Sequence, residues 1–447
     1  MRRATRASRC SVARPQADDG GAFVNIESRS KEILRVALLT GGGDKPYATA
    51  LAEALSGRGV ALDFVGSDEL DIPEIRELSG VRFLNLRGDQ RSAVSMRRKV
   101  TRVARYYARL IRYAATSPAA VFHVLWNNKV EYVDRTLLLL YYRLLGKRLV
   151  LTVHNVNAAQ RDGGDSVLNR LTLGIQYRLA HHLFVHTDAM QRQLQEEFGV
   201  AAERITTIPF GINSTASTTP LNGQQARQEL GLPDSARVIL FFGNIAPYKG
   251  LEYAVAAMAR LARTQPHARL LVAGRLKTSG DYWPKIAGAI RQSGLAQRIL
   301  LHTTYIPDER IEVYFKAADV LILPYTHVFQ SGVVFLGYHF GLPAIVSDVG
   351  ELKQAVIEGV TGFVCVPADA DALADALDRY FRSALYEQLE RRRPEIRRLM
   401  SERHSWDHVG DVTRGVYRAL TEREPLTTRG GEPHPGERMP TKSADPF

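Results

Sequence analysis

Cysteine is almost absent from this chain of 447 residues, which carries only Cys10 and Cys365. Two cysteines are too few for a disulfide framework and lack the close spacing of a metal cluster, so a reducing compartment is expected. Cys365 follows two apolar residues, Phe363 and Val364. That setting is typical of a thiol in the core of a strand, and a nucleophilic role is the less favoured alternative. The cytoplasm is therefore the expected location.

Long apolar runs are also missing. A membrane-spanning helix needs roughly 18 consecutive apolar residues, whereas the nearest candidate, residues 137–142, is short and is followed by Arg143, Lys147 and Arg148. We interpret this run as a buried helix.

The N-terminus lacks the apolar centre of a secretory signal. Its first fourteen residues contain five arginines and no acidic residue. We expect residues 1–33 to be a disordered leader, and an organelle transit peptide is the alternative. Residues 421–447, rich in proline, glycine and charge, are expected to be a disordered tail.

Several familiar catalytic motifs do not occur. The chain has no HExxH zinc helix, no Walker phosphate loop, no GxSxG nucleophile elbow and no cluster of aspartates for a metal. We therefore expect neither a metal nor a resident cofactor. Any phosphate group would then be neutralised by basic side chains and backbone amides.

What the sequence does contain is an alternation of strand and helix patterns that runs through the chain twice. In the first half, apolar strand patterns lie at 35–40, 61–65, 121–125, 149–153 and 183–185. A linker rich in serine and threonine follows at 214–223. Beyond it, strand patterns return at 238–242, 270–273, 320–324 and 344–347. Such alternation predicts parallel sheets with right-handed crossovers.

We therefore predict an α/β protein in which two Rossmann-like, doubly wound parallel-sheet domains face a cleft. The first domain is expected over 34–213, the second over 224–405, and a final helix over 406–420.

Residues suited to binding an anion follow the predicted strands. In open parallel sheets, ligands bind outside the carboxyl ends of the strands. The candidates at those ends are Gly42 and Gly43, His154 and Asn155, Gly243 and Asn244, Gly274 and Arg275, and the turn Gln330, Ser331, Gly332 and Val333.

Three of these features have two interpretations each. Lys249, after the turn at Gly243, could supply a point charge to a diphosphate, or could be a solvated lysine in an ordinary turn. Ser331 precedes an apolar helix whose free amides would favour a phosphate, or it is a plain N-cap. His154 could donate a hydrogen bond or stabilise a charge, or could be structural.

Five segments together resemble glycosyltransferase family 4, also called glycosyl transferases group 1, which has the GT-B fold. They are residues 243–251, 317–324, 340–347 and 359–367, and the pair His154-Asn155. The resemblance extends from about Leu34 to Leu420. It implies retaining transfer of a sugar from a nucleoside-diphosphate sugar to a hydroxyl of a glycan or lipid-linked acceptor, without a metal. It also implies that His154 is catalytic, that the strand-end residues bind the donor, and that the final helix returns to the first domain.

The sequence departs from the family pattern at several positions. The two glutamates of the family, eight residues apart, fall on Val328 and Leu336, Asn244 replaces a common arginine, and Gln354 stands near a usual acidic position. An apolar side chain cannot accept a hydrogen bond from a sugar hydroxyl. A non-catalytic nucleotide-binding, glycan-binding or scaffold protein, or another GT-B enzyme such as an epimerase, therefore remains an alternative.

Positive charge is concentrated in residues 87–112, which hold nine Arg or Lys and one Asp. One predicted helix face carries Arg98, Arg102, Arg105, Arg109 and Arg112. The opposite face carries Met96, Val100, Val103, Tyr107, Leu110 and Ala114. The arginines either form a solvated surface or meet anionic lipid headgroups. Nucleic acid is not expected, since no recognition motif accompanies the charge. The predicted function is synthesis of a surface polysaccharide or glycolipid at the inner face of the membrane.

Overall fold

A computed structural model of the protein describes residues 33–41, 45–90, 95–128, 130–161, 164–212, 219–277, 280–328 and 331–422. The predicted leader up to residue 32, the predicted tail beyond residue 422 and residues 214–218 of the predicted linker lie outside the described residues. So do three of the predicted donor-binding residues, Gly42, Gly43 and Gln330.

The first sheet has seven parallel strands in the order β3-β2-β1-β4-β5-β6-β7. The strands are β1 (Arg35–Leu39), β2 (Ala61–Gly66), β3 (Val81–Asn85), β4 (Val121–Val124), β5 (Arg148–Thr152), β6 (His182–Val185) and β7 (Ile205–Thr207). Strand order reverses between β1 and β4, which is where a doubly wound sheet opens a crevice at its carboxyl edge.

Helices cover both faces of this sheet because side chains of each strand alternate between two cores. One core packs against α1 (Lys45–Ser56) and α17 (Trp406–Glu422). The other packs against α3 (Met96–Thr116), α5 (Leu139–Leu144), α7 (Val167–Leu179) and α8 (Asp188–Phe198). The shorter helices are α2 (Pro73–Arg76), α4 (Glu131–Val133), the π-helical turn η2 (Asp134–Leu138) and α6 (Ala158–Arg161).

The second sheet has six parallel strands in the order β10-β9-β8-β11-β12-β13. The strands are β8 (Arg237–Phe242), β9 (Ala268–Ala273), β10 (Ile299–His302), β11 (Val320–Leu323), β12 (Ala344–Ser347) and β13 (Gly362–Cys365). The helices are α9 (Gly223–Glu229), α10 (Leu251–Thr264), α11 (Tyr282–Gln292), α12 (Ile311–Ala317), α13 (Gly332–His339), α14 (Ala370–Phe381), α15 (Ala384–Glu387) and α16 (Leu389–Arg403). Cys365 lies in the core of this sheet, and burial raises the pKa of its thiol to about 11. The core interpretation of this cysteine is therefore confirmed.

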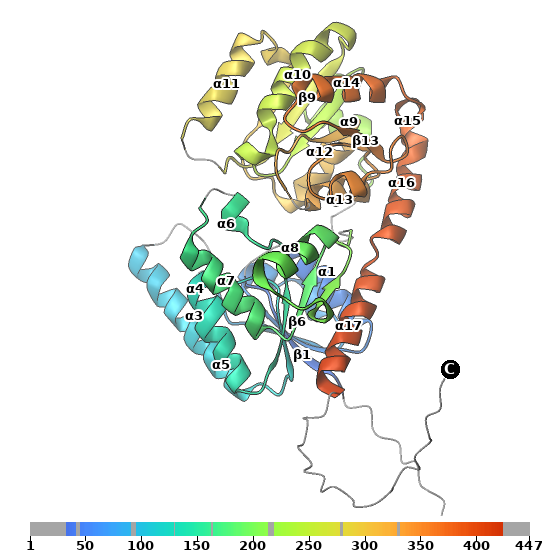
Figure 1. Ribbon diagram of the computed structural model, residues 1–447. Helices are drawn as coiled ribbons and strands as arrows, with labels where there is room; N and C mark the ends of the chain where they lie inside the picture. Colours follow the sequence, from blue (N-terminus) through green and yellow to red (C-terminus); the bar gives the residue numbers. More distant parts are fainter. Residues whose placement is uncertain are drawn as a thin grey trace, which may run out of the picture. The chain divides into compact units, whose positions relative to one another are not determined.

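The last helix, α17, packs against α1 on the first sheet, as predicted (Figure 1). The hydroxyl of Tyr417 lies 2.5 Å from Nδ1 of His123 in the middle of β4. At the start of the helix, Nε1 of Trp406 donates to the carbonyl oxygen of Ile212 at 2.8 Å. Arg58 after α1 forms an ion pair with Asp411. These contacts tie the end of the described chain to the first strand–helix units.

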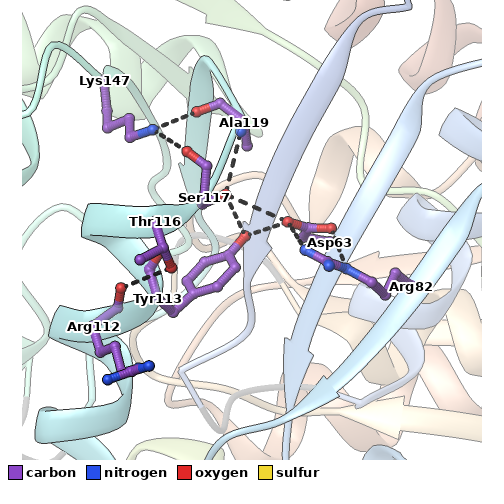
Figure 2. Close-up of polar contacts among 8 residues, drawn as sticks. All are labelled: Asp63, Arg82, Arg112, Tyr113, Thr116, Ser117, Ala119 and Lys147. Carbon is purple, nitrogen blue, oxygen red and sulfur yellow. Dashed lines mark hydrogen bonds and ion pairs between the residues drawn. The ribbon is translucent and has the colours of Figure 1, made fainter.

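Helix α3 is fixed to the sheet by a buried carboxylate (Figure 2). Asp63 of β2 is only 3% exposed and accepts two hydrogen bonds from Arg82 of β3, at 2.9 and 2.8 Å. The hydroxyl of Tyr113 on α3 donates to the same carboxylate at 2.8 Å, and that of Ser117 does so at 3.4 Å. Arg112, next to Tyr113, extends away from the cluster (Figure 2). The contact therefore sets which side of α3 faces the core.

Two expectations about apolar faces are wrong in part. The run 137–142 is not wholly buried: Leu138, Leu139 and Tyr142 face the core, but Leu137 and Leu140 are exposed. On α3, the residues packed against the core are Tyr106, Leu110, Tyr113 and Ala114, whereas Met96 and Val100 near the start of the helix are exposed. In both cases the helix is one layer on a sheet and buries only the side that touches the strands. None of the helices in the described part of the chain has the length and hydropathy that a membrane crossing requires.

Candidate functional site

A pocket of about 420 Å³ brings together five residues predicted to bind a donor. They are Asn244, Lys249, Ser331, Gly332 and Val333. Tyr47 and Phe210, from the half of the chain that forms the first sheet, line the same pocket, as does Trp406 at the start of α17. Gly274 and Arg275 follow β9 but are not among the residues that line it.

Lys249 lies in this pocket because two glycines shape the turn after β8. Gly243 has a φ of 103°, and a Cβ at this position would lie 2.8 Å from Nζ of Lys249. Gly250 has a φ of 66°, and a Cβ there would lie 2.0 Å from the carbonyl oxygen of Pro324. The turn therefore accommodates the lysine only as long as both positions lack a side chain.

Lys249 is almost completely buried and packs against an aromatic ring. It is 6% exposed, and its Nζ lies 5.1 Å from the centroid of the Tyr325 ring. No carboxylate of the described residues forms an ion pair with it. A buried cation that has only a ring as partner can gain strongly from an anion entering the pocket.

Ser331 is the N-cap of α13, which confirms one of its two interpretations. Its Oγ accepts a hydrogen bond from the amide of Val333 at 3.3 Å and lies 3.4 Å from the hydroxyl of Tyr325. The start of α13 lines the pocket together with Lys249. A helix start carries partial positive charge, so the same residue can cap the helix and stand beside an anion.

The rest of this pocket is apolar where the family pattern has acids. Val328 and Leu336 both line it, and Phe210 stacks on Phe335 with ring centroids 5.5 Å apart. No carboxylate lines the pocket within the described residues. The pocket can thus hold a phosphate group by charge, but it offers no acidic acceptor for sugar hydroxyls.

A second pocket, of about 360 Å³, lies at the carboxyl ends of β4 and β5. It contains the predicted residues His154 and Asn155. Among its other polar residues are Asn127, Glu131, Arg135 and Gln176. The sequence analysis missed these four, because no local pattern shows that η2 and α7 approach the ends of two strands.

The second pocket holds polar atoms that lack partners. Nε of Arg135, Nε2 of His154 and Oδ1 of Asn155 are buried without a hydrogen bond among the described residues. The guanidinium of Arg135 otherwise donates to Asn169 at 2.8 Å and forms an ion pair with Glu131. Buried donors and acceptors without partners are costly. A ligand with hydroxyl groups, which both donate and accept, would satisfy both kinds.

Two histidines form a pair whose hydrogen-bond direction is set by the backbone. Nδ1 of His186 lies 3.3 Å from the carbonyl oxygen of Ile208, and its Nε2 lies 3.2 Å from Nδ1 of His154. A carbonyl oxygen only accepts, so Nδ1 of His186 carries the proton and its Nε2 is the acceptor in the neutral ring. His154 therefore donates from Nδ1 and keeps a lone pair on Nε2.

Both histidine rings are neutral at neutral pH. Burial lowers the pKa of His154 well below its ordinary value, and His186 lowers it further. Burial lowers the pKa of His186 to about 4. The arrangement favours a role for His154 as a hydrogen-bond acceptor over the donor or charge-stabilising role predicted from the sequence.

Aromatic rings connect the two pockets. The ring centroids of Trp126 and His154 lie 4.2 Å apart with the two rings nearly parallel, and those of Tyr47 and His154 lie 4.7 Å apart with the rings nearly perpendicular. Tyr47 also lies 5.0 Å from Trp406 and lines the first pocket. Tyr47 thus lines the first pocket, which we call the lysine pocket, and contacts His154 of the second, which we call the histidine pocket.

Comparisons with known proteins agree on one family. Residues 41–216 match the family described as Glycosyltransferase Family 4, and residues 222–398 match Glycosyl transferases group 1. A D-inositol 3-phosphate glycosyltransferase of Acidothermus cellulolyticus is 28% identical over 403 residues, which cover 87% of this chain and 88% of that protein. Glycogen synthase of Mycobacterium tuberculosis is 28% identical over 302 residues, or 65% of this chain and 66% of that protein.

Solved structures share the fold. Sucrose-phosphate synthase from Thermosynechococcus elongatus superimposes with a TM-score of 0.68 at 22% identity, covering 87% of this chain and 99% of that one. Anabaena Alr3699/HepE, in complex with UDP-glucose, superimposes with a TM-score of 0.64 at 17% identity, covering 86% of this chain and 99% of that one.

Proposed function

The chain belongs to glycosyltransferase family 4, and on that basis we propose that it moves a sugar from a nucleoside-diphosphate sugar to a hydroxyl acceptor with retention of configuration. It is a glycosyltransferase with the GT-B fold. The proposed product is a surface polysaccharide or a glycolipid. The single observation that carries the proposal is the pocket where buried Lys249 and the start of α13 meet.

The donor diphosphate is assigned to the lysine pocket. Lys249 supplies a full charge, and the start of α13 at Ser331–Val333 supplies backbone amides with partial positive charge. A diphosphate placed here stabilises the buried ammonium, and the charge that builds up on the leaving phosphate in the transition state is stabilised in return. Lys249 and α13 can provide this stabilisation without a metal ion. UDP-glucose is bound by Alr3699/HepE, which has the same fold, and this supports a nucleotide-sugar as the donor.

The acceptor is assigned to the histidine pocket. Its unpartnered Nε of Arg135 can donate, and its unpartnered Nε2 of His154 and Oδ1 of Asn155 can accept. The lone pair on His154 would accept a hydrogen bond from a substrate hydroxyl and so fix its position relative to the donor. Tyr47, which lines the lysine pocket and contacts His154, would lie between the two substrates.

A second candidate function follows from the apolar wall of the lysine pocket. Val328 and Leu336 give a donor sugar no carboxylate acceptor. With the sugar held only through its phosphates, the protein would bind a nucleotide or a glycan without transferring it. Both functions predict nucleotide binding, but only the transferase predicts turnover.

Release of nucleoside diphosphate distinguishes them. The full chain is incubated with UDP-, GDP-, ADP- and dTDP-sugars, with and without a lipid and glycan extract as the source of acceptors. Release that depends on the extract, with the anomeric configuration kept in the product, supports the transferase. Binding of a donor without any release supports the second function, and an inverted anomer contradicts the retaining mechanism.

A further inference from the structure

Helices η2–α5 and α7 present apolar side chains to solvent. The exposed fractions are 65% for Leu137, 45% for Leu140 and 78% for Leu144 on η2–α5, and 85% for Val167, 54% for Leu168 and 59% for Leu171 on α7. The same helices bury Tyr142 and Tyr177 on their other sides. Exposure of so many large apolar groups on neighbouring helices is unusual for a surface that meets only water.

These helices lie next to the arginine face of α3. All three cover the same face of the first sheet (Figure 1). The hydroxyl of Tyr141 on α5 donates to the carbonyl oxygen of Ile111 on α3 at 3.1 Å, which joins α5 to α3. Arg135 on η2 donates to Asn169 on α7 at 2.8 Å, which joins η2 to α7. The leucines and the arginines therefore belong to one continuous layer.

The charge on this layer is strongly one-sided. Helix α3 holds seven Arg or Lys and no acidic residue, and Arg98, Arg105, Arg109 and Arg112 are exposed. Among the acidic residues nearby, Glu131 forms an ion pair with Arg135, and Asp165 forms one with Arg170. The hydrogen bond from Tyr113 to Asp63 holds α3 in the orientation in which Arg112 extends away from the buried cluster (Figure 2).

We propose that this layer binds the surface of an anionic phospholipid bilayer, and we name it the α3–α5–α7 face. Leu137, Leu140 and Leu144 would enter the boundary between headgroups and acyl chains, while the arginines of α3 contact lipid phosphates. A second copy of the chain fits less well, because a two-fold interface would bring two arginine rows together without acids to separate them. Nucleic acid would satisfy the arginines but not the leucines.

This assignment rests on the proposed function, since it makes a membrane-borne hydroxyl compound the acceptor. It also goes beyond the arginine helix that the sequence indicates. Leu137 and Leu140, which belong to the run predicted to be a buried helix, supply the apolar part of the face together with Leu144.

Vesicle flotation tests the proposal with the full chain. Vesicles of phosphatidylcholine, with and without phosphatidylglycerol, are mixed with the protein and separated on a density gradient. One variant carries Leu137→Glu and Leu144→Glu, and another carries Arg105→Glu and Arg109→Glu. The matched control carries Val360→Glu and Val366→Glu, at exposed apolar positions around β13. Circular dichroism melting shows whether each variant is folded.

The expected result is binding to the anionic vesicles that falls at least about tenfold in both the leucine and the arginine variants, while the control binds like wild type. Absence of binding to anionic vesicles, or binding that survives both substitutions, overturns the proposal. So does a wild-type dimer in light scattering that the leucine variant loses, since a second copy then covers the face. Donor affinity is measured on the same variants. No substituted residue lines the lysine pocket, so donor binding should stay unchanged in all of them. Donor binding without vesicle binding therefore contradicts the membrane proposal alone, whereas absence of donor binding contradicts the proposed function.

Discussion

At the scale of single residues, the hydrogen bonds of His186 and His154 determine which nitrogen of each ring carries the proton. The carbonyl oxygen of Ile208 fixes the tautomer of His186, which in turn fixes that of His154. Replacing His186→Phe removes the acceptor for Nδ1 of His154 and frees its ring to change tautomer. We expect turnover to fall roughly tenfold, the value of one neutral hydrogen bond, while donor affinity stays unchanged.

The conservative variant His186→Gln serves as the control for this prediction. Its amide oxygen can still accept from Nδ1 of His154, so it should keep most of the activity. Steady-state kcat and a separately measured donor Kd check both variants. Equal losses in the Phe and Gln variants, or a loss confined to donor affinity, would count against the tautomer argument.

The buried histidines also predict how stability depends on pH. Burial lowers the pKa of His123 to about 3 and that of His186 to about 4, from an ordinary 6.5. Below pH 6.5 these histidines become protonated in the unfolded chain but stay neutral in the folded chain. The free energy of unfolding should therefore fall as the pH drops from 6.5 toward 4. Each ring contributes about 1.4 kcal/mol per pH unit. Urea unfolding at pH 7.5, 6.5 and 5.5 measures the slope of the free energy of unfolding against pH, and His123→Gln should reduce this slope. A free energy that does not change with pH would contradict the prediction.

The sequence predicts the positions of some residues of the candidate site but not of others. Lys249 and Ser331 follow apolar strand patterns, so their place at the carboxyl edge of a sheet could be predicted from the sequence. Arg135 could not, because it lies on a π-helical turn and reaches the pocket only through the packing of η2 against α7. The direction of the histidine pair depends on a backbone carbonyl that no sequence pattern marks.

At the scale of elements, the central strands were predictable, whereas of the four edge strands only β13, around Cys365, was indicated by the sequence. Strands such as β1 and β8 are covered on both faces and show as continuous apolar runs. By contrast, β3 and β10 lie at sheet edges and β7 has three residues, and their apolar pattern is interrupted by Arg82, His302 and Thr206. The faces of α3 and α5 were misjudged for a related reason, because apolar spacing alone does not tell a core-facing side from an exposed apolar one.

The attachment of α3 gives a prediction at this scale. Replacing Asp63→Ala leaves the Tyr113 hydroxyl without its buried acceptor and breaks the pair with Arg82. We expect the free energy of unfolding to fall by about 3 kcal/mol. Asp71→Ala, which breaks the more exposed pair with Arg76, is the matched control and should cost much less. Urea unfolding compares the two, and similar losses would show that Asp63 is no anchor.

At the scale of the whole molecule, the sequence predicts two parallel-sheet units because the strand–helix pattern starts again beyond the linker. The return of α17 to α1 was an expectation from family resemblance, and His123 and Tyr417 now give it a physical basis, since their contact joins positions 294 residues apart. The lysine pocket could not be predicted as a pocket, because it needs Tyr47 and Trp406 beside Lys249. Such proximity is a property of the complete fold.

The central claim is that a nucleoside-diphosphate sugar binds at Lys249, and calorimetry tests it most directly. Wild type, Lys249→Ala and the exposed control Lys285→Ala are titrated with UDP-, GDP-, ADP- and dTDP-sugars. Loss of a charged hydrogen bond in a buried site should weaken binding of the preferred donor at least about tenfold in Lys249→Ala, and the control should bind like wild type. Failure of every donor to bind wild type, or equal affinity of wild type and Lys249→Ala, would contradict the account.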